Sequence, residues 1–183
     1  MQYSSKVILK NNKPCLLRNC QAEDAQMIYD LFNLTHEQTD FLLTYPDENS
    51  FDVEQERNFL IEKEDSSNEI EIAAFVDDKA VGSAGIEAIG NKEKMKHRAE
   101  IGISIEKTYW GLGIGRALMR ACIDVARQAE YQQVELNVVS DNRSAIALYK
   151  SLGFVEYGRN PRGFRSRISG WQELVSMRLE LDV

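Results

Sequence analysis

The segment from residue 98 to residue 139 limits the folds open to this chain more than any other part of the sequence. In Arg98–Ile105, apolar side chains alternate with polar or small ones, which is typical of a strand with one buried face. A glycine loop, Trp110–Gly115, follows and leads into apolar residues at helical spacing, which predict a long helix to about Glu130. Gln133–Val139 favours a further strand. Strand, loop, helix and strand in this order predict an α/β domain.

The rest of the chain adds further strands and helices to this unit. Strands are predicted at residues 7–17, 70–76, 79–89, 154–158 and 171–181, and helices at residues 22–34, 51–64 and 142–152. Asp77-Asp78 predicts a tight turn, Gly153 predicts the end of a helix, and a basic turn is expected between the last two strands. The pattern predicts an α/β sandwich built on one mixed sheet.

Length and composition favour one domain. The chain has 183 residues, 43% of them hydrophobic, and no repeat or linker divides it. Its net charge is −7, so nucleic acid, whose phosphates attract basic surfaces, is not an expected partner. No apolar run approaches the roughly 20 residues of a membrane span, and no signal peptide is recognised. We therefore expect a cytoplasmic protein that does not bind membranes.

Cysteine and histidine are too few and too scattered to suggest a metal centre. The chain has Cys15, Cys20 and Cys122, with no CxxC pair, and His36 and His97 lie far apart in sequence. Neither a zinc site nor a disulfide framework is expected.

The glycine loop has the composition of an anion site. Gly111, Gly113 and Gly115 allow a ligand to approach the backbone, and the first turn of the following helix offers free N–H groups. Such a helix start favours phosphate or pyrophosphate, and Arg116 adds a positive charge. The loop matches neither GxxxxGK[ST] nor GxGxxG. A tight turn that only caps the helix is the alternative interpretation.

A second motif follows the loop and distinguishes these interpretations. It consists of Asn137, Asn142, Ala145, Tyr149, Gly153 and Phe154 at the spacing Asn…Asn-x-x-Ala-x-x-x-Tyr-x-x-x-Gly-Phe. With the glycine loop before it, this sequence resembles the GCN5-related N-acetyltransferase (GNAT) superfamily. The superfamily loop is [Q/R]-x-x-G-x-[G/A], which Gly113 and Gly115 match, whereas Trp110 replaces the usual Gln or Arg. The resemblance covers roughly residues 73–181.

The resemblance implies a fold and a division of the chain. The fold would be GNAT-like, with a central mixed, mostly antiparallel sheet flanked by helices and splayed between the strands 98–105 and 133–139. A bulge near Ile103 and Ser104 would accompany the splay. The whole chain, 1–183, would form a single acetyltransferase domain, with a variable acceptor-side region at 1–69 and an acetyl-CoA-binding core at 70–183.

The implied function is that of an acetyl-CoA-dependent N-acetyltransferase. The acetyl group would move from the CoA thioester to a primary amine by direct attack in a ternary complex, with acetyl-CoA as cosubstrate and no metal. The acceptor would be a small-molecule or peptide amine, and polyamine, aminoglycoside, amino acid, peptide N-terminus and small toxic amine all stay open. The resemblance also favours a homodimer. A transferase of another acyl group and a non-catalytic acyl-CoA sensor are the alternatives.

The resemblance also assigns residues to the cosubstrate. Backbone groups at Ile103, Ser104 and Ile105 would pair with pantetheine. The remaining cosubstrate-binding residues would be Gly111, Leu112, Gly113, Ile114, Gly115, Arg116, Asn137, Asn142, Ala145 and Tyr149. Asn142 also suits a helix N-cap, a role compatible with cosubstrate binding.

Two residues are the catalytic candidates. Tyr149 would donate a hydrogen bond to the departing thiolate, and a purely packing role is its alternative. Glu100 would act as a base through water or would bind the amine, and a solvated strand carboxylate is its alternative.

Two further groups have a weaker claim to the acceptor site. One lies in the variable region that covers the acceptor in related proteins, and the other is a compact basic cluster that could hold an anionic acceptor group. The groups are His36, Glu37 and Asp40, and Arg162, Arg165 and Arg167. Surface loop positions and a solvated turn are the competing interpretations.

Overall fold

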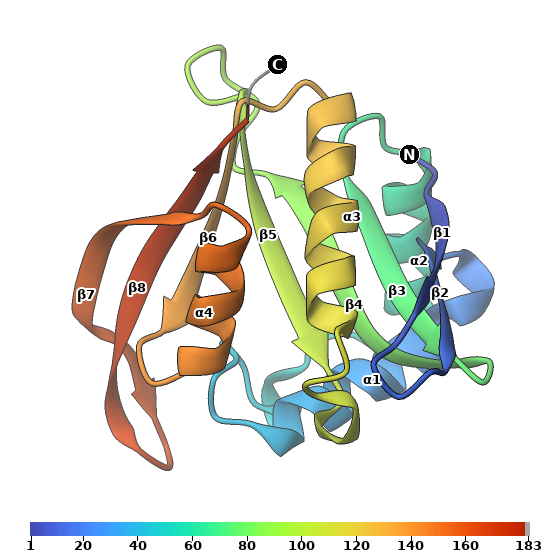
Figure 1. The fold of residues 1–183 in the computed structure, drawn as a ribbon, viewed down its shortest axis with the longest axis horizontal. Helices are drawn as coiled ribbons and strands as arrows, with labels where there is room; N and C mark the ends of the chain where they lie inside the picture. The colour runs from blue at the N-terminus through green and yellow to red at the C-terminus, as the bar shows by residue number, and fades with distance from the viewer. Residues whose placement is uncertain (182–183) are drawn as a thin grey trace.

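The computed structural model describes residues 1–181. These residues form one eight-stranded sheet with helices packed on it (Figure 1). Its eight strands are β1 (Ser4–Ile8), β2 (Pro14–Asn19), β3 (Ile70–Val76), β4 (Lys79–Ala88), β5 (Arg98–Ile105), β6 (Gln133–Val139), β7 (Val155–Ser166) and β8 (Gly170–Glu180). Their order in the sheet is β1-β2-β3-β4-β5-β6-β8-β7. Within this described part, β5 and β6 are the parallel pair and the other neighbours are antiparallel. The predicted mixed, mostly antiparallel sheet is confirmed.

Helices cover both faces of this sheet. They are α1 (Ala25–Gln38), α2 (Val53–Asp65), α3 (Ile114–Gln128) and α4 (Arg143–Ser151). Figure 1 shows α3 and α4 in front of the sheet and α1 and α2 behind it. The sheet therefore separates the face that carries the glycine loop from the face that the N-terminal region covers.

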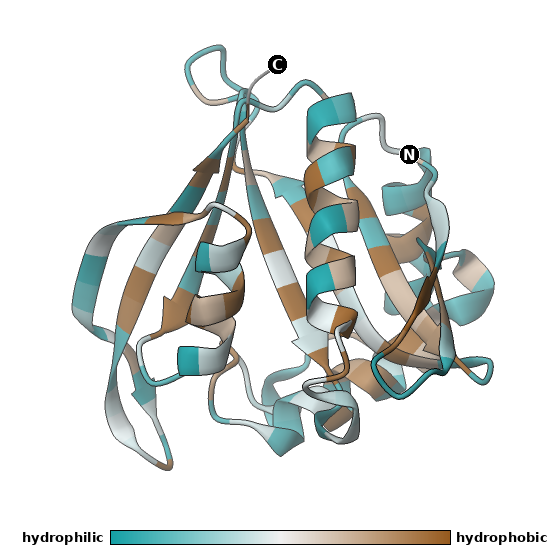
Figure 2. Cartoon of the chain, in the orientation of Figure 1, coloured by the Kyte–Doolittle hydropathy of each residue, from teal (hydrophilic) through white to brown (hydrophobic). Residues whose placement is uncertain are grey.

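The core follows from the alternation of side chains along the strands. Figure 2 shows apolar bands alternating with polar ones on the central strands. Ile101, Leu118 and Val134 belong to the larger core between the sheet and α3. Ile28 and Leu60 belong to the smaller core under α1 and α2. Removing these apolar surfaces from water is the main free-energy gain that holds the layers together.

The splay between β5 and β6 is present. Their registered pairs are Arg98–Gln133, Ala99–Val134 and Glu100–Glu135, after which the two strands diverge (Figure 1). The bulge expected near Ile103 and Ser104 is wrong, because β5 keeps a continuous register with β4 from Ala99 to Ile105. The divergence needs no irregularity in β5, since β5 stays on β4 while β6 turns away.

Two local predictions at the ends of the chain are also wrong. The expected strand 7–17 is two strands, because Asn12 adopts φ +64° and reverses the chain between β1 and β2. The expected basic turn is mostly strand, since β7 continues to Ser166 and only three residues separate it from β8. Pro161 fits in β7 because an edge strand can lack one N–H without losing a ladder bond.

The turn predicted at Asp77-Asp78 is confirmed, with φ +50° and +60° at the two residues. Gly153, with φ +96°, follows the end of α4 as expected.

Over residues 1–181, no helix is both long and apolar enough to cross a membrane.

Candidate functional site

The diverging end of β5 presents an unpaired backbone edge. Glu106 N–H donates to Val81 O and Ile89 N–H donates to Arg98 O, so the even-numbered residues of β5 turn their backbone groups toward β4. The N–H and C=O groups of Ile103 and Ile105 therefore face β6. Within residues 1–181, no strand pairs with β5 on that side beyond Glu100. An extended ligand with amide groups can form strand-like hydrogen bonds there.

The side chains on this part of β5 divide between the two faces. Ile103 and Ile105 pack toward α3, where their Cδ1 atoms lie 4.0 and 3.2 Å from the position a Cβ would take on Gly115. Glu100 and Ser104 lie on the opposite face. The backbone of Ser104 pairs with β4, so this predicted cosubstrate residue differs from its two neighbours.

The glycine loop has the backbone geometry of an anion site. Gly111 and Gly113 have φ +77° and +101°, and Gly113 is the N-cap of α3. The first hydrogen bond of the helix runs from Ala117 N–H to Gly113 O. The N–H groups of Ile114, Gly115 and Arg116 therefore have no acceptor within the helix. They are the donors that a pyrophosphate would use.

Gly115 serves a different purpose from the two glycines before it. A Cβ at Gly115 would lie 3.2 Å from side-chain atoms of both Ile105 and Leu148, so the glycine lets β5, α3 and α4 approach closely without displacing these side chains. Arg116 donates to the Ser151 hydroxyl at 2.9 Å and so connects α3 to α4. The predicted turn is thus also a packing point between three elements.

The loop is attached to the rest of the molecule by contacts that no sequence motif indicated. Lys10 N–H donates to Leu112 O at 3.1 Å, which ties the loop to the β1–β2 turn. Trp110 Nε1–H donates to Ile105 O at 2.7 Å. The residue that departs from the superfamily pattern therefore contacts the strand edge. The only signal in the sequence for this contact was that Trp110 stands where the superfamily pattern has Gln or Arg.

Tyr149 is buried on α4, with 7% of its surface exposed, and its ring centroid lies 5.9 Å from that of Phe154. Burial raises the pKa of its phenol to about 12. Its hydroxyl makes no hydrogen bond among residues 1–181. It is also not among the enclosed unpaired atoms there, of which Arg178 Nε is the single case. The hydroxyl therefore reaches accessible space and is free to donate to a ligand.

The remaining residues of the second motif surround the start of α4. Asn142 is its N-cap, and its Oδ1 accepts from Ala145 N–H at 3.2 Å, which confirms the capping role. Ala145 packs against the larger core. Asn137 is exposed on β6, and its Oδ1 accepts from the Ser176 hydroxyl at 2.8 Å.

Glu100 is exposed on the sheet face opposite Tyr149, in register with Glu87 on β4 and Glu135 on β6. Glu87 pairs with Lys63 Nζ at 3.0 Å, and Glu135 forms a two-point contact with Arg98. Glu100 has no ion pair or side-chain hydrogen bond within residues 1–181. It is the unneutralised member of a row of three glutamates, where a cationic amine would be attracted.

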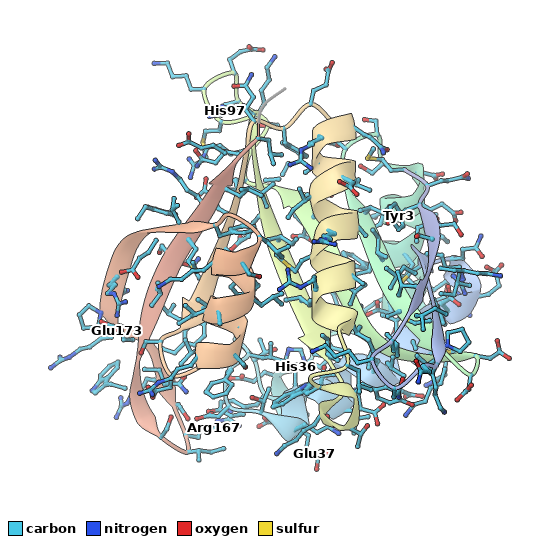
Figure 3. All side chains as sticks on the ribbon, viewed as in Figure 1. Tyr3, His36, Glu37, His97, Arg167 and Glu173 are labelled. Atoms are coloured by element: carbon cyan, nitrogen blue, oxygen red, sulfur yellow. The ribbon has the colours of Figure 1, made fainter. Side chains whose placement is uncertain are left out.

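The acceptor-side candidates have mainly structural contacts. His36 stacks on Phe32 with ring centroids 3.8 Å apart, and burial lowers its pKa. Glu37 is exposed at the end of α1, and Figure 3 shows it near the same edge of the molecule as Arg167. Asp40 accepts hydrogen bonds from Ser166, Ser169 and Gln172, and so fastens the segment after α1 to the β7–β8 hairpin.

The arginines of that hairpin also have protein partners. Arg167 pairs with Asp47 at 2.8 Å and stacks on Tyr45. Arg162 and Arg165 both stack on the exposed Trp171, with guanidinium carbons 5.3 and 5.5 Å from its ring centroid. These contacts support a structural role for Arg167 and hold the other two at the hairpin surface.

No arrangement of three or more His, Cys, Asp and Glu side chains suited to a metal ion occurs within residues 1–181. The three cysteines are buried free thiols.

Comparison with known structures supports the fold assignment. The acetyltransferase of the GNAT family from Streptococcus pneumoniae superposes with a TM-score of 0.87 and 27% identity, over 91% of this chain and 99% of that one. YncA, a putative acetyltransferase from Salmonella typhimurium solved with its cofactor acetyl-CoA, superposes with a TM-score of 0.80. Its identity is 20%, over 92% of this chain and 94% of that one, so this likeness concerns the fold.

Relatives found by sequence match a part of the chain. The N-alpha-acetyltransferase RimI of Mycobacterium tuberculosis is 39% identical over 85 residues, which are 46% of this chain and 51% of that protein. The L-amino acid N-acyltransferase MnaT of Escherichia coli is 30% identical over 87 residues, 48% of this chain and 50% of that protein. The chain thus spans about half the length of these curated relatives. The family model for the acetyltransferase (GNAT) family matches residues 26–154, and the chain belongs to that family.

Proposed function

We propose that this protein is an acetyl-CoA-dependent N-acetyltransferase that transfers the acetyl group directly to a primary amine within a ternary complex. The observation that carries the proposal is the edge of β5 that β6 leaves unpaired beyond Glu100, because this edge ends at Ile105, beside the glycine loop and its free helix N–H groups. Pantetheine would pair with the backbone of Ile103 and with the N–H of Ile105, whose carbonyl accepts from Trp110. The pyrophosphate would bind the first turn of α3.

The two catalytic candidates lie on opposite faces of the sheet, which leaves a separate approach for each of the two substrates. Tyr149 is on α4, on the face that carries the glycine loop, whereas Glu100 lies on the face that α1 and α2 partly cover. The thioester would enter from the first face and the amine from the second. The two would meet where β5 and β6 separate. This division supports a domain in which residues 1–69 shape the acceptor side and residues 70–183 bind the cosubstrate.

The reaction joins the amine nitrogen to the thioester carbonyl carbon and breaks the carbon–sulfur bond. An unperturbed alkylammonium has a pKa of about 10.4 and must first lose a proton, which Glu100 would accept directly or through a water molecule. A backbone N–H on the β5 edge would stabilise the negative charge that develops on the carbonyl oxygen. The acetylated amine and CoA are the products.

Tyr149 would stabilise the departing thiolate by donating a hydrogen bond. With the phenol pKa at about 12 and a free thiol near 8.5, complete proton transfer to sulfur would be uphill by roughly 5 kcal/mol. A hydrogen bond in the transition state avoids that cost. The proton that CoA finally acquires would come from solvent or from the carboxyl group of Glu100, which has accepted a proton from the amine.

The decisive experiment measures thiol release from acetyl-CoA with a panel of amines, and identifies the acetylated product by mass spectrometry. The panel should contain free L-amino acids, polyamines, an aminoglycoside and short peptides. Turnover with at least one amine, giving equal amounts of CoA and N-acetyl product, is expected. Tight CoA binding without turnover of any amine would contradict the proposal and favour an acyl-CoA sensor.

Glu100 has its own test. E100Q removes the proton acceptor but keeps the size of the side chain, and should lower kcat/KM for the amine by about 10²-fold near pH 7. Raising the pH should restore part of the activity, because the amine then loses its proton to solvent. E93Q is the matched control, since the Glu93 side chain is 87% exposed and its one ion-pair partner among the described residues is Lys96. Equal pH profiles for E100Q and wild type would exclude Glu100 as the base.

A further inference from the structure

Trp110 is where the glycine loop departs from the superfamily pattern, and its side chain joins the two parts of the cosubstrate site. The indole Nε1–H donates to the carbonyl of Ile105 at 2.7 Å. Ile105 belongs to the edge of β5 that β6 does not pair with, and Trp110 begins the loop that ends at the N-cap of α3. One hydrogen bond therefore connects the backbone edge to the anion-binding loop.

Both sides of this connection are held by other contacts. Glu106 N–H donates to Val81 O at 2.9 Å and Lys107 N–H donates to Gln38 Oε1 at 2.7 Å, which fixes the chain just before Trp110. Leu112 O accepts from Lys10 N–H, which fixes the loop just after it. The Lys107 ammonium lies 5.9 Å from the centre of the indole ring. The indole thus bridges two anchored segments.

We propose that Trp110 is a positioning residue that holds the glycine loop and the β5 edge at the spacing required by a single CoA molecule. The inference rests on the proposed function, because it assigns pyrophosphate to the loop and pantetheine to the edge. A ligand that binds at two points binds more tightly when their separation is already set, because less conformational freedom is lost on binding. Trp110 sets that separation through a direct hydrogen bond from one part to the other.

The test compares two thioesters that differ in whether they reach the loop. Acetyl-CoA contacts both parts, whereas S-acetylpantetheine lacks the pyrophosphate and contacts only the edge. W110F removes the N–H donor and keeps an aromatic ring. W110F should lower kcat/KM for acetyl-CoA about five- to tenfold, which is the effect of one lost hydrogen bond. Its kcat/KM for S-acetylpantetheine should stay within twofold of the wild-type value. A merely structural role would lower both values equally.

W171F is the matched control. Trp171 is the second of the two tryptophans in the chain and is 55% exposed on β8, compared with 45% for Trp110. W171F should leave kcat/KM for both thioesters unchanged. It also makes Trp110 the single tryptophan, so a change in indole emission when CoA is added, without a change for pantetheine, reports occupation of the loop. If W110F does not fold, 3-benzothienylalanine at position 110 keeps the bicyclic shape and removes only the donor.

Calorimetric titration with CoA and with pantetheine provides the same comparison without turnover. If W110F binds CoA with the same Kd as wild type, the positioning role of Trp110 is overturned. If it binds CoA more tightly, the indole instead competes with pantetheine for Ile105 O, which also overturns the proposal. Wild type that binds CoA but transfers no acetyl group refutes the proposed function and leaves this inference open to the same titration. Wild type that does not bind CoA refutes both.

Discussion

Glu100 lies directly opposite Glu135 in the last registered pair of β5 and β6, and only Glu135 is neutralised. Its hydrogen bonds with the Arg98 guanidinium hold the pKa of Glu135 below its usual range, and Gln133 and Tyr157 also donate to it. Two like charges placed opposite each other destabilise a sheet. Here Arg98 offsets one of them and leaves the other free at the point where the strands separate.

Removing the Tyr149 hydroxyl separates chemistry from packing. Y149F keeps the ring and should lower kcat by about 10²-fold, with a smaller change in the KM for acetyl-CoA, because the lost hydrogen bond forms mainly in the transition state. Steady-state kinetics with one good acceptor, after the melting temperatures are compared, provide the measurement. A kcat within threefold of wild type, about 0.65 kcal/mol, would remove Tyr149 from the mechanism.

Y131F is the control for this variant. Tyr131 is also buried, and its hydroxyl accepts from Asn68 Nδ2 at 2.8 Å, away from the site. This variant should lose about 1 kcal/mol of stability and keep its kcat.

Replacing Gly113 tests the anion site. G113A forces a Cβ into the left-handed backbone conformation at the N-cap of α3, which disturbs the donors of the first turn. Loss of one hydrogen bond to a charged group predicts a rise of about 10- to 100-fold in the Kd for CoA, measured by calorimetry. G115V is less suitable, because a Cβ there already crowds Ile105 and Leu148.

G170A serves as its control. Gly170 has φ +78° at the start of β8, and no atom outside its chain neighbours lies within 4 Å of a Cβ added to it; the same holds for Gly113. Both variants should therefore lose similar stability through backbone strain, whereas CoA affinity should fall only in G113A. A similar CoA affinity in both variants would contradict the loop assignment.

Two acids where α2 packs on the sheet, Glu56 on α2 and Glu71 on β3, should make the stability of the protein depend on pH. Burial raises the pKa of Glu71 to about 7 and that of Glu56 to about 6. The folded state thus binds protons more tightly than the unfolded chain, so these groups lower the free energy of unfolding as pH rises from about 4.5 to 7. E71Q has no proton to lose. It should melt higher than wild type at pH 8, by roughly 2–8 °C for an effect of 1–2 kcal/mol, and should show no such gain at pH 4.5.

E54Q is the reference for that comparison, because the Glu54 side chain on α2 is 73% exposed. Thermal unfolding of the three proteins across this pH range provides the measurement. A constant difference between E71Q and wild type at all pH values would show that the carboxyl does not titrate differently on folding.

Asp40 should matter more to stability than the nearby Asp47. D40N loses a partly buried acceptor shared by Ser166, Ser169 and Gln172, which we expect to cost about 1–2 kcal/mol. D47N breaks an ion pair with Arg167 in which both side chains are more than half exposed, worth about 0–1 kcal/mol. Urea unfolding should rank the two variants in this order, and the reverse order would show that Asp40 does not fasten the hairpin.

Much of the fold could be predicted because its signals are local. The alternation in Arg98–Ile105 gave the bounds of β5 correctly, since a strand exposes successive side chains to opposite faces. Gly113 occupies the left-handed conformation, and Asn142 caps α4 through an amide three residues away. The strand β8 was predicted to within one residue at each end, whereas β7 was predicted too short, because its second half is stabilised by pairing with β8 rather than by a marked pattern in residues 158–166.

The sequence by itself determined the central strands, the amphipathic helices and the turns, because these depend on neighbours within a few residues. Tertiary structure alone decided which polar groups far apart in the sequence are partnered. Asp40 meets Ser166 across 126 positions, Trp110 turns back onto the strand edge, and Arg98 pairs with Glu135 rather than Glu100. Such contacts arise only when the packed layers bring distant segments together. No periodicity or spacing in the sequence records them.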